Sequence, residues 1–368
     1  MKSHKWLYPH EAEELGFKAK PNEQKRNQAR YYLSEEQIKE LNGIRGDYMD
    51  NIPLTVKGTT TLLDKDGKEV LKWVKKDQKT EDRLNALRSA IDTLKEDIPK
   101  EHPVKHIKHG NKKLCNQYTL TDYHLGLMAW GEESGDDWDI KIAENTLLKF
   151  FSTAIEQSPN AKECIFAQIG DFLHWDGLEA VTPANKHVLD ADTRFTKLVR
   201  VAIRVIRKIV RKLLAKYDKV TLIMAEGNHD PASSTWLREV FNAFYEDEPR
   251  ITVNTNPDPY YNHNFGKVCL FYHHGHKSRL NNIDSVFVSK FKKEYGKAKY
   301  VYGHTGHLHH QKTIETNLMI LEQHRTLSAK DSYASRGGWS SGRDSKVITY
   351  HEQYGEVSRN IIGINMIK

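Results

Sequence analysis

The sequence predicts an α/β protein with a small α+β appendage at its N-terminus. Three observations support this fold class. From about residue 113 onward, short apolar segments alternate with helical stretches. Each apolar segment ends in polar residues, as in sheets whose functional groups lie on the loops after the strands. Residues 1–98 differ, because they are rich in Lys, Glu, Gln and Asn and contain few long apolar segments.

Length, charge and cysteine content limit the class of protein. The chain has 368 residues, which favours two domains or one large domain with an appendage. Its formal net charge of +7 favours a polyanionic partner such as nucleic acid. Mean hydropathy is −0.70, and no apolar run has the length of a membrane span or a signal peptide. Its three cysteines, Cys115, Cys164 and Cys269, are too widely spaced for a disulfide framework or a thiolate zinc site. We therefore expect a cytoplasmic protein with His, Asp and Asn as its metal ligands.

The N-terminal appendage contains three predicted elements. Residues 34–41 begin with a capping box and predict a short helix. Residues 59–76 predict a hairpin that turns at an Asp-Gly pair, and 80–98 predict an amphipathic helix. We interpret 1–98 as a winged-helix-like or partner-binding module, or alternatively as a small structural extension. Residues 99–112, with two prolines and many basic residues, predict a linker.

Residues 113–368 are predicted to form the α/β domain. Its strands are predicted from five apolar segments, at 114–121, 163–170, 220–227, 268–274 and 299–304. Residues 196–217 predict an amphipathic helix whose apolar stripe packs on the sheet, with an arginine-rich nucleic-acid-binding face as the alternative. A Gly/Ser/Arg loop and a final strand pair follow. Arg336, Trp339 and Arg343 in that loop either contact the substrate or cap the sheet.

Potential metal ligands follow all five apolar segments. They are Asp122 and His124; Asp171, His174 and Asp176; Asn228, His229 and Asp230; His273, His274 and His276; and His304, His307, His309 and His310. A mixture of carboxylate, amide and imidazole suits Mn²⁺, Fe²⁺ or Zn²⁺. The spacing of Asp122 and His124 allows both side chains to reach one ion, because alternate residues of a strand face the same side. Paired cations can activate water and neutralise charge on a phosphoryl group.

Five motifs formed by these residues resemble the signature blocks of the calcineurin-like metallophosphoesterase superfamily. They are Asp122-x-His124, Gly170-Asp171, Gly227-Asn228-His229-Asp230, His274-Gly275 and Gly306-His307-x-His309, within roughly residues 115–310. The resemblance implies a sandwich of two mixed β-sheets flanked by helices. It also implies two divalent metal ions, which we expect to be Mn²⁺, with Fe²⁺ or Zn²⁺ as alternatives.

The same resemblance implies a role for individual residues. Asp122, His124, Asp171 and His309 would hold one ion, and Asp171, Asn228, His274 and His307 the other, so that Asp171 bridges the two. His229 would face the scissile phosphate and be oriented by Asp230. Members of the superfamily often read Gly-His-Thr-His in the last block, whereas this chain inserts a glycine, so His304 is the alternative to His307 or His309. We expect His310 to lie in solvent or behind the ligands, and His273 to pack beneath the site.

The second motif, GDFLHWDG, distinguishes branches of the superfamily. It lacks the arginine that follows the second aspartate in phosphoprotein phosphatases. It resembles the Gly-Asp-Leu-Phe-His block of SbcD-like DNA repair exonucleases, which implies a catalytic role for His174. The alternative for His174 is a loop histidine that hydrogen-bonds Asp122 or Asp176. The appendage and composition are also similar to those of phage-encoded members.

The expected activity is therefore metal-dependent hydrolysis of phosphodiester bonds, most directly in DNA, by a nuclease or exonuclease. A phosphomonoesterase or a cyclic-nucleotide phosphodiesterase on the same metal centre is one alternative. A nucleic-acid-binding protein without activity is another. The expected partners are DNA or another phosphodiester substrate, and a protein bound through the N-terminal region, but no membrane.

Overall fold

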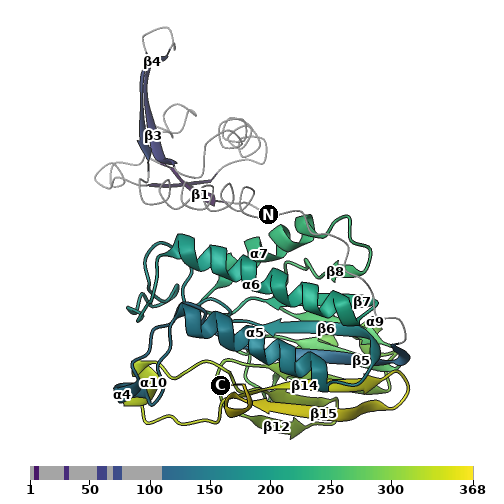
Figure 1. Cartoon of the computed structure of the whole chain (residues 1–368). Helices are drawn as coiled ribbons and strands as arrows, with labels where there is room; N and C mark the ends of the chain where they lie inside the picture. Colours follow the sequence, from purple (N-terminus) through teal and green to yellow (C-terminus); the bar gives the residue numbers. More distant parts are fainter. Residues whose placement is uncertain (1–3, 8–28, 33–55, 64–68, 77–109, 368) are drawn as a thin grey trace. The chain divides into compact units, whose positions relative to one another are not determined.

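The computed structural model describes residues 4–7, 29–32, 56–63, 69–76 and 110–367 (Figure 1). The chain divides into two compact units, residues 1–84 and 85–368. In the first unit, β3 (Val56–Leu63) pairs antiparallel with β4 (Glu69–Lys76), which confirms the predicted hairpin. A second antiparallel pair joins β1 (His4–Leu7) to β2 (Ala29–Tyr32).

Several predictions for the first hundred residues lie outside the described residues. They concern the helices at 34–41 and 80–98, the hairpin turn, and most of the linker at 99–112. The proposed domain boundary at residue 98 stays a prediction. The first strand of the second unit begins at Asn111, at the end of the predicted linker.

One of the two large sheets has six strands in the order β15-β14-β5-β6-β7-β8. Four of them run parallel: β5 (Asn111–Leu120), β6 (Ala161–Ile169), β7 (Lys219–Ala225) and β8 (Ile251–Val253). The other two pair antiparallel: β14 (Asp344–His351) with β5, and β15 (Gly355–Gly363) with β14. The sheet is therefore mixed, and the last two strands confirm the predicted C-terminal pair.

The second large sheet has five strands in the order β12-β13-β11-β10-β9. In chain order they are β9 (Tyr261–Phe265), β10 (Val268–Tyr272), β11 (Tyr300–Thr305), β12 (Lys312–Glu315) and β13 (Ile320–Gln323). β10 and β13 run parallel to β11, whereas the two edge strands are antiparallel to their neighbours. This sheet is mixed as well.

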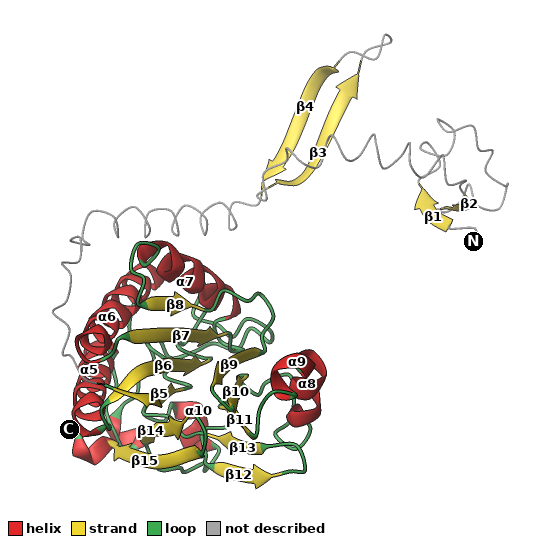
Figure 2. Cartoon of the chain, turned by 90° about the vertical axis from the view of Figure 1, so that its right-hand side faces the viewer, coloured by secondary structure: helices red, strands yellow, loops and turns green. Residues whose placement is uncertain are grey.

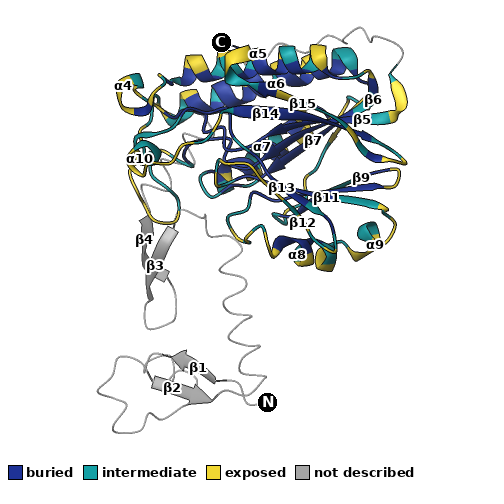
Figure 3. Cartoon of the chain, turned by 90° about the horizontal axis from the view of Figure 1, so that it is seen from below, coloured by how far each residue is buried: buried dark blue, intermediate teal, exposed yellow. Residues whose placement is uncertain are grey.

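Helices cover the outer faces of both sheets (Figures 2 and 3). The longer helices are α5 (Ile140–Gln157), α6 (Phe195–Lys216), α7 (Pro231–Phe244) and α8 (Ile283–Lys290). The short ones are α4 (Gly131–Ser134), α9 (Lys292–Tyr295), α10 (Ser332–Arg336) and a 3-10 turn at Ile364–Met366. None of the helices in the part of the chain that the structure describes is both long enough and apolar enough to cross a membrane.

The alternation of side chains along each strand builds the layers. In β6, Cys164 and Phe166 pack with apolar residues of α5 and α6, whereas Ile165 and Ala167 face the other sheet. On the far side, Phe271 of β10 packs against α8. Successive residues of a strand point to opposite faces, so each sheet carries one core on each side. The result is the predicted fold class: two mixed sheets packed face to face and flanked by helices.

The amphipathic helix predicted at 196–217 is α6. Its apolar stripe, which includes Leu198, Val205 and Ile209, is buried in the core between α6 and the six-stranded sheet. On the outer side, Arg204 Nε donates to Glu144 Oε1 of α5 at 2.9 Å. The expectation that this helix packs on the sheet is therefore confirmed.

Candidate metal centre

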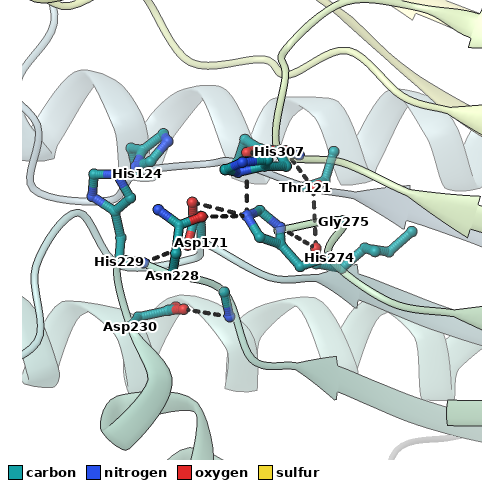
Figure 4. A network of polar contacts seen from close by, with 12 residues as sticks. Thr121, His124, Asp171, Asn228, His229, Asp230, His274, Gly275 and His307 are labelled. Atoms are coloured by element: carbon teal, nitrogen blue, oxygen red, sulfur yellow. Dashed lines mark hydrogen bonds and ion pairs between the residues drawn. The ribbon is translucent and has the colours of Figure 1, made fainter. Parts of the chain in front are cut away.

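Five loops bring the predicted ligands together at the ends of five strands. β5, β6 and β7 of one sheet, and β10 and β11 of the other, are each followed by one of the five motifs. Figure 4 shows Asp171, Asn228 and His307 gathered around the imidazole of His274. Because parallel strands present their carboxyl ends at one edge of a sheet, residues from distant parts of the sequence converge there.

One group of donor atoms comes from Asp122, His124 and His309. His309 Nε2 lies 3.2 Å from Asp122 Oδ1 and 3.3 Å from His124 Nε2. Asp122 and His124 are buried, whereas the side chain of His309 is 40% exposed. Two of the three donor residues are therefore buried, and the third, His309, lies on the side of the group that is open to solvent.

A second group comes from Asp171, His274 and His307. His274 Nε2 lies 3.0 Å from Asp171 Oδ2 and 3.2 Å from Asn228 Oδ1. The opposite ring nitrogen of His274 donates to the Ile169 carbonyl at 2.8 Å, so Nε2 is the ring atom that faces the carboxylate. The two groups are adjacent, because His274 Nε2 also lies 3.8 Å from Asp122 Oδ1.

The donor atoms fit two metal ions. Ligand atoms at about 2.1 Å from one ion are separated by roughly 3 Å. The distances from His309 to Asp122 and His124, and from His274 to Asp171, are 3.0–3.3 Å. Asp122 and Asp171 are 0% and 1% exposed, and within the described ranges their ion pairs are to histidines. Buried carboxylates need cationic partners. Divalent ions at these two groups would supply that charge and would use the imidazole lone pairs.

The backbone of the site is held in uncommon conformations. In the described part of the chain, six residues other than glycine have positive φ, and five of them are predicted ligands: Asp122, His124, Asp171, His307 and His309, with φ between 47° and 76°. Such conformations cost free energy and cluster at functional sites. The surrounding structure therefore maintains strained backbone where the donor atoms meet.

Two glycines leave space for the carboxylates. A Cβ at Gly227 would overlap the Asp171 carboxylate, and a Cβ at Gly306 would overlap the Asp122 carboxylate and the Thr121 hydroxyl. Gly306 does not have a positive φ. Glycine is thus required there by close approach rather than by a tight turn.

The ionisation of the site reflects its crowded charges. Burial alone would lower the pKa of His274, but Asp171 and Asp122 outweigh burial and raise the pKa to about 10. Burial would raise the pKa of Asp122, but His274 and His309 hold it well below its usual range. The same balance, with His274 and His229 as the main partners, lowers the pKa of Asp171. In the absence of metal, the histidines therefore act as the counterions of both carboxylates.

His229 lies beside the donor groups but is oriented differently from the prediction. Its Nδ1 donates to the His174 carbonyl at 2.9 Å, while its backbone N–H donates to Asp171 Oδ1 at 2.8 Å. The buried Asp230 carboxylate instead accepts from the N–H groups of Gly227 and Leu173. Burial and the charge of Asp171 raise the pKa of Asp230 to about 7. The expectation that Asp230 orients the His229 ring is wrong, because both carboxylate oxygens of Asp230 accept hydrogen bonds from backbone N–H groups instead.

His174 contacts the predicted metal ligand His124 and not a carboxylate. Its Nδ1 lies 3.3 Å from His124 Nδ1, and its ring stacks on that of His229 at a centroid distance of 5.7 Å. Nε2 of His174 is buried and has no hydrogen-bond partner among the described residues. Burial and the neighbouring His229 lower the pKa of His174 to about 3. The alternative in which His174 hydrogen-bonds Asp122 or Asp176 is therefore wrong.

His304, the alternative ligand, lies elsewhere. Its Nδ1 lies 2.9 Å from His324 Nε2, and its Nε2 lies 3.0 Å from the Tyr350 hydroxyl. Both ring nitrogens are thus occupied inside the sandwich. His304, Glu322 and His324 form another group with metal-like spacing, as do His124, His174 and His229. Beside Glu322, however, Lys346 Nζ lies 2.5 Å from Oε1 and already supplies the positive charge.

Four other polar residues of the motifs also lie outside the two donor groups. Asp176 accepts from the N–H groups of Ala232 and Ser233 and so caps α7. His273 is buried and stacks on Tyr260, which agrees with packing beneath the site. His310 is exposed. His276 lies close to His274 and His307, with ring centroids 5.4 and 6.3 Å away.

Two threonines support Asp122 and were not predicted. Thr121 Oγ1 donates to Asp122 Oδ2 at 2.6 Å, and Thr326 Oγ1 donates to the Asp122 carbonyl at 2.6 Å. Thr121 precedes the first motif directly, so its position next to a ligand was a usable signal. No sequence signal marks Thr326, which is 204 residues away.

Comparisons with known proteins give similarity in structure only. No family model and no curated protein matches the chain. Solved structures that resemble it include a predicted phosphoesterase from Streptococcus pneumoniae, with 9% identity, a TM-score of 0.32, and coverage of 68% of this chain and 91% of that one. A dimetal phosphatase from Danio rerio has 8% identity and a TM-score of 0.34, with coverage of 68% and 98%. A 5'-nucleotidase from Candida albicans has 12% identity and a TM-score of 0.32, with coverage of 72% of this chain and 53% of that one. Similarities this low carry no argument about function.

Proposed function

We propose that the chain is a calcineurin-like metallophosphoesterase that hydrolyses phosphodiester bonds in DNA and uses two divalent metal ions, expected to be Mn²⁺. One observation carries the proposal: two adjacent groups of carboxylate and imidazole donors meet where His274 Nε2 lies 3.0 Å from Asp171 and 3.8 Å from Asp122. The resemblance of the five motifs to the superfamily supports the same conclusion.

The residues that would hold the metal ions are those of the two groups. Asp122, His124 and His309 would hold one ion, and Asn228, His274 and His307 the other, with Asp171 shared between them. When bound, a pair of divalent ions supplies an activated water and neutralises charge on the phosphoryl oxygens. The protein contributes donor atoms that are already positioned, because strained backbone and buried hydrogen bonds hold them before any ion arrives.

His174 would act through hydrogen bonding. If His124 Nε2 faces a metal ion, the proton of His124 lies on Nδ1 and is donated to His174 Nδ1, 3.3 Å away. The remaining proton of His174 then lies on Nε2, the atom that has no partner in the described structure. An oxygen of the substrate would have to enter the buried part of the site to accept from this N–H, and His174 also fixes the tautomer of His124.

His229 would contact the phosphate from the open side of the site. Its Nδ1 is occupied by the His174 carbonyl, so its Nε2 is left for the substrate. His229 is only partly buried, and its ring lies 4.7 Å from that of His124. A donor placed here stabilises charge that develops on the phosphoryl group.

Two features favour a diester in a polynucleotide over a phosphate monoester. His174 stands in the second motif, which lacks the arginine found in phosphoprotein phosphatases of the superfamily. The net charge of +7 favours a polyanionic substrate through release of counterions.

The test is digestion of end-labelled single- and double-stranded DNA in Mn²⁺, beside bis-aryl and mono-aryl phosphates. We expect DNA cleavage by the wild type, a loss of at least about 100-fold in kcat for His174→Ala, and a complete loss for Asp171→Asn. His310→Ala is the matched control, because His310 is an exposed histidine in the same loop as two ligands, and it should retain full activity. Intact DNA together with rapid turnover of the mono-aryl phosphate would replace the nuclease assignment with a phosphomonoesterase.

A further inference from the structure

Two exposed aromatic side chains form a pair in the loop region before β14. Tyr333 of α10 is 69% exposed and Trp339 is 58% exposed. Their ring centroids are 5.3 Å apart, with the planes inclined at 60°. Large aromatic groups left in water together are uncommon on a folded protein and mark binding surfaces.

Contacts within the loop support the pair. The backbone N–H of Trp339 donates to the Ala334 carbonyl at 3.1 Å. The indole lies against Gly337, where an added Cβ would come within 3.0 Å of the ring. A side chain at position 337 would therefore push against the indole as it lies on the turn.

The helix that carries Tyr333 is tied to two other segments. Ser332 Oγ donates to Asp190 Oδ2 at 2.6 Å, and Ser335 Oγ donates to the Glu133 carbonyl of α4 at 2.7 Å. α4 and α10 lie next to each other in Figure 1. An aromatic surface fixed in this way loses little conformational entropy when it binds a ligand.

The pair is connected to the candidate metal centre. Ser341 Oγ donates to the carbonyl of His309, a proposed ligand, at 2.6 Å. Trp339 precedes Ser341 by two residues, so their Cα atoms are at most about 8 Å apart. A strand with a phosphate at the metal centre would therefore pass a loop that contacts a ligand residue and carries the indole.

The charges around the pair favour a planar group over a run of phosphates. Arg343 does not face solvent, because it donates to the Leu327 carbonyl and to Asp136 and lies over the Trp138 ring. Arg336 is paired with Glu133. Because both arginines are already paired with carboxylates, binding would depend on stacking.

We propose that Trp339, supported by Tyr333, is a stacking site for a nucleobase of a single-stranded polynucleotide whose scissile phosphate lies at the metal centre. The inference rests on the proposed function, since it concerns the same substrate. It assigns to Trp339 the positioning of the strand end and not a part in the chemistry. Stacking of a base on an aromatic side chain tolerates any base, so the subsite gives affinity without sequence preference.

The kinetic test compares Trp339→Ala, Trp339→Phe and the control Tyr354→Ala on an oligothymidylate. Tyr354 is also an exposed aromatic residue, at 65%, but lies in the turn between β14 and β15. We expect KM to rise about tenfold in Trp339→Ala, to recover most of the wild-type value in Trp339→Phe, and to stay unchanged in Tyr354→Ala. On the same oligonucleotide with abasic residues, wild type and Trp339→Ala should have equal KM values. Equal KM values on the normal oligonucleotide, or the same rise on the abasic one, would overturn the proposal.

A binding test separates this inference from the proposed function. Oligothymidylate should quench tryptophan fluorescence of the full chain in EDTA, the abasic oligonucleotide should not, and Trp339→Phe should lose the base-dependent quenching. If the wild type hydrolyses an aryl diester but not DNA, the nuclease assignment fails, and the fluorescence result alone decides the stacking site. Equal quenching by both oligonucleotides, or base-dependent quenching that persists in Trp339→Phe, would refute it.

Discussion

Two features fix the positions of the residues in the candidate metal centre. The backbone of the ligands is strained, and two carboxylates lie directly against glycine residues. Five predicted ligands have left-handed φ values, and the Asp171 and Asp122 carboxylates occupy space that a side chain at Gly227 or Gly306 would fill. These constraints explain why the motifs contain glycine next to the ligands. They also make the geometry of the donor groups sensitive to a single methyl group.

Gly227→Ala should therefore impair metal binding more than folding. The added Cβ overlaps the Asp171 carboxylate and would displace it from His274. We expect Mn²⁺ affinity measured by titration calorimetry to fall at least about tenfold, a loss of the size seen when groups that support metal ligands are changed. Gly177→Ala is the matched control, because a Cβ at Gly177 in the nearby loop meets no atom within 4 Å. Wild-type affinity in Gly227→Ala would contradict the geometry described here.

At the scale of elements, strand ends assemble the donors, and a buried polar network joins the two sheets beneath them. Glu322 of β13 accepts from Lys346 of β14 and from Arg359 of β15, at 2.5 and 2.8 Å. His304 of β11 contacts Tyr350 of β14. These contacts cross from the five-stranded to the six-stranded sheet and so fix how one sheet lies on the other.

The charge of Glu322 should make stability depend on pH. Burial alone would raise its pKa, but His324, Arg359 and Lys346 outweigh burial and hold the pKa well below the usual 4.5. The stabilisation is thus complete above pH 4.5 and is lost as the pH falls toward the pKa of the folded state. We expect Glu322→Gln to lower the free energy of unfolding by about 3–5 kcal/mol at pH 7. The difference from wild type should shrink below pH 4.5 in urea titrations.

The control is a substitution of a second glutamate that pairs with the same arginine, Arg359. Glu356 also pairs with Arg359, but its side chain is partly exposed, so Glu356→Gln should cost less than about 1 kcal/mol. A Glu322→Gln effect that stays constant between pH 7 and pH 3 would show that the carboxylate charge does not act across the sheets.

For the whole molecule, local patterns in the sequence predicted the five strands that precede the motifs, the C-terminal strand pair and the α6 helix, but not β8, β9, β12 or β13. The layered fold and the division of the ligands between two ions followed from the resemblance of the five motifs. Roles that depend on distant contacts could not be predicted. Asp176 caps a helix 56 residues away, and His304 joins a network with Tyr350, 46 residues away. Asp230 bonds Leu173 instead of its neighbour His229. In each case, the partner is supplied by the packing of two sheets, which no local pattern contains.

The central claim is that two metal ions bind side by side in the two donor groups. A crystal structure of the Mn²⁺-loaded protein, with anomalous diffraction at the manganese edge, tests this claim most directly. We predict two anomalous peaks about 3.5–4 Å apart, one among Asp122, His124 and His309 and the other among Asn228, His274 and His307, with Asp171 between them. A single peak, or a peak at His304, Glu322 and His324 instead, would contradict the account.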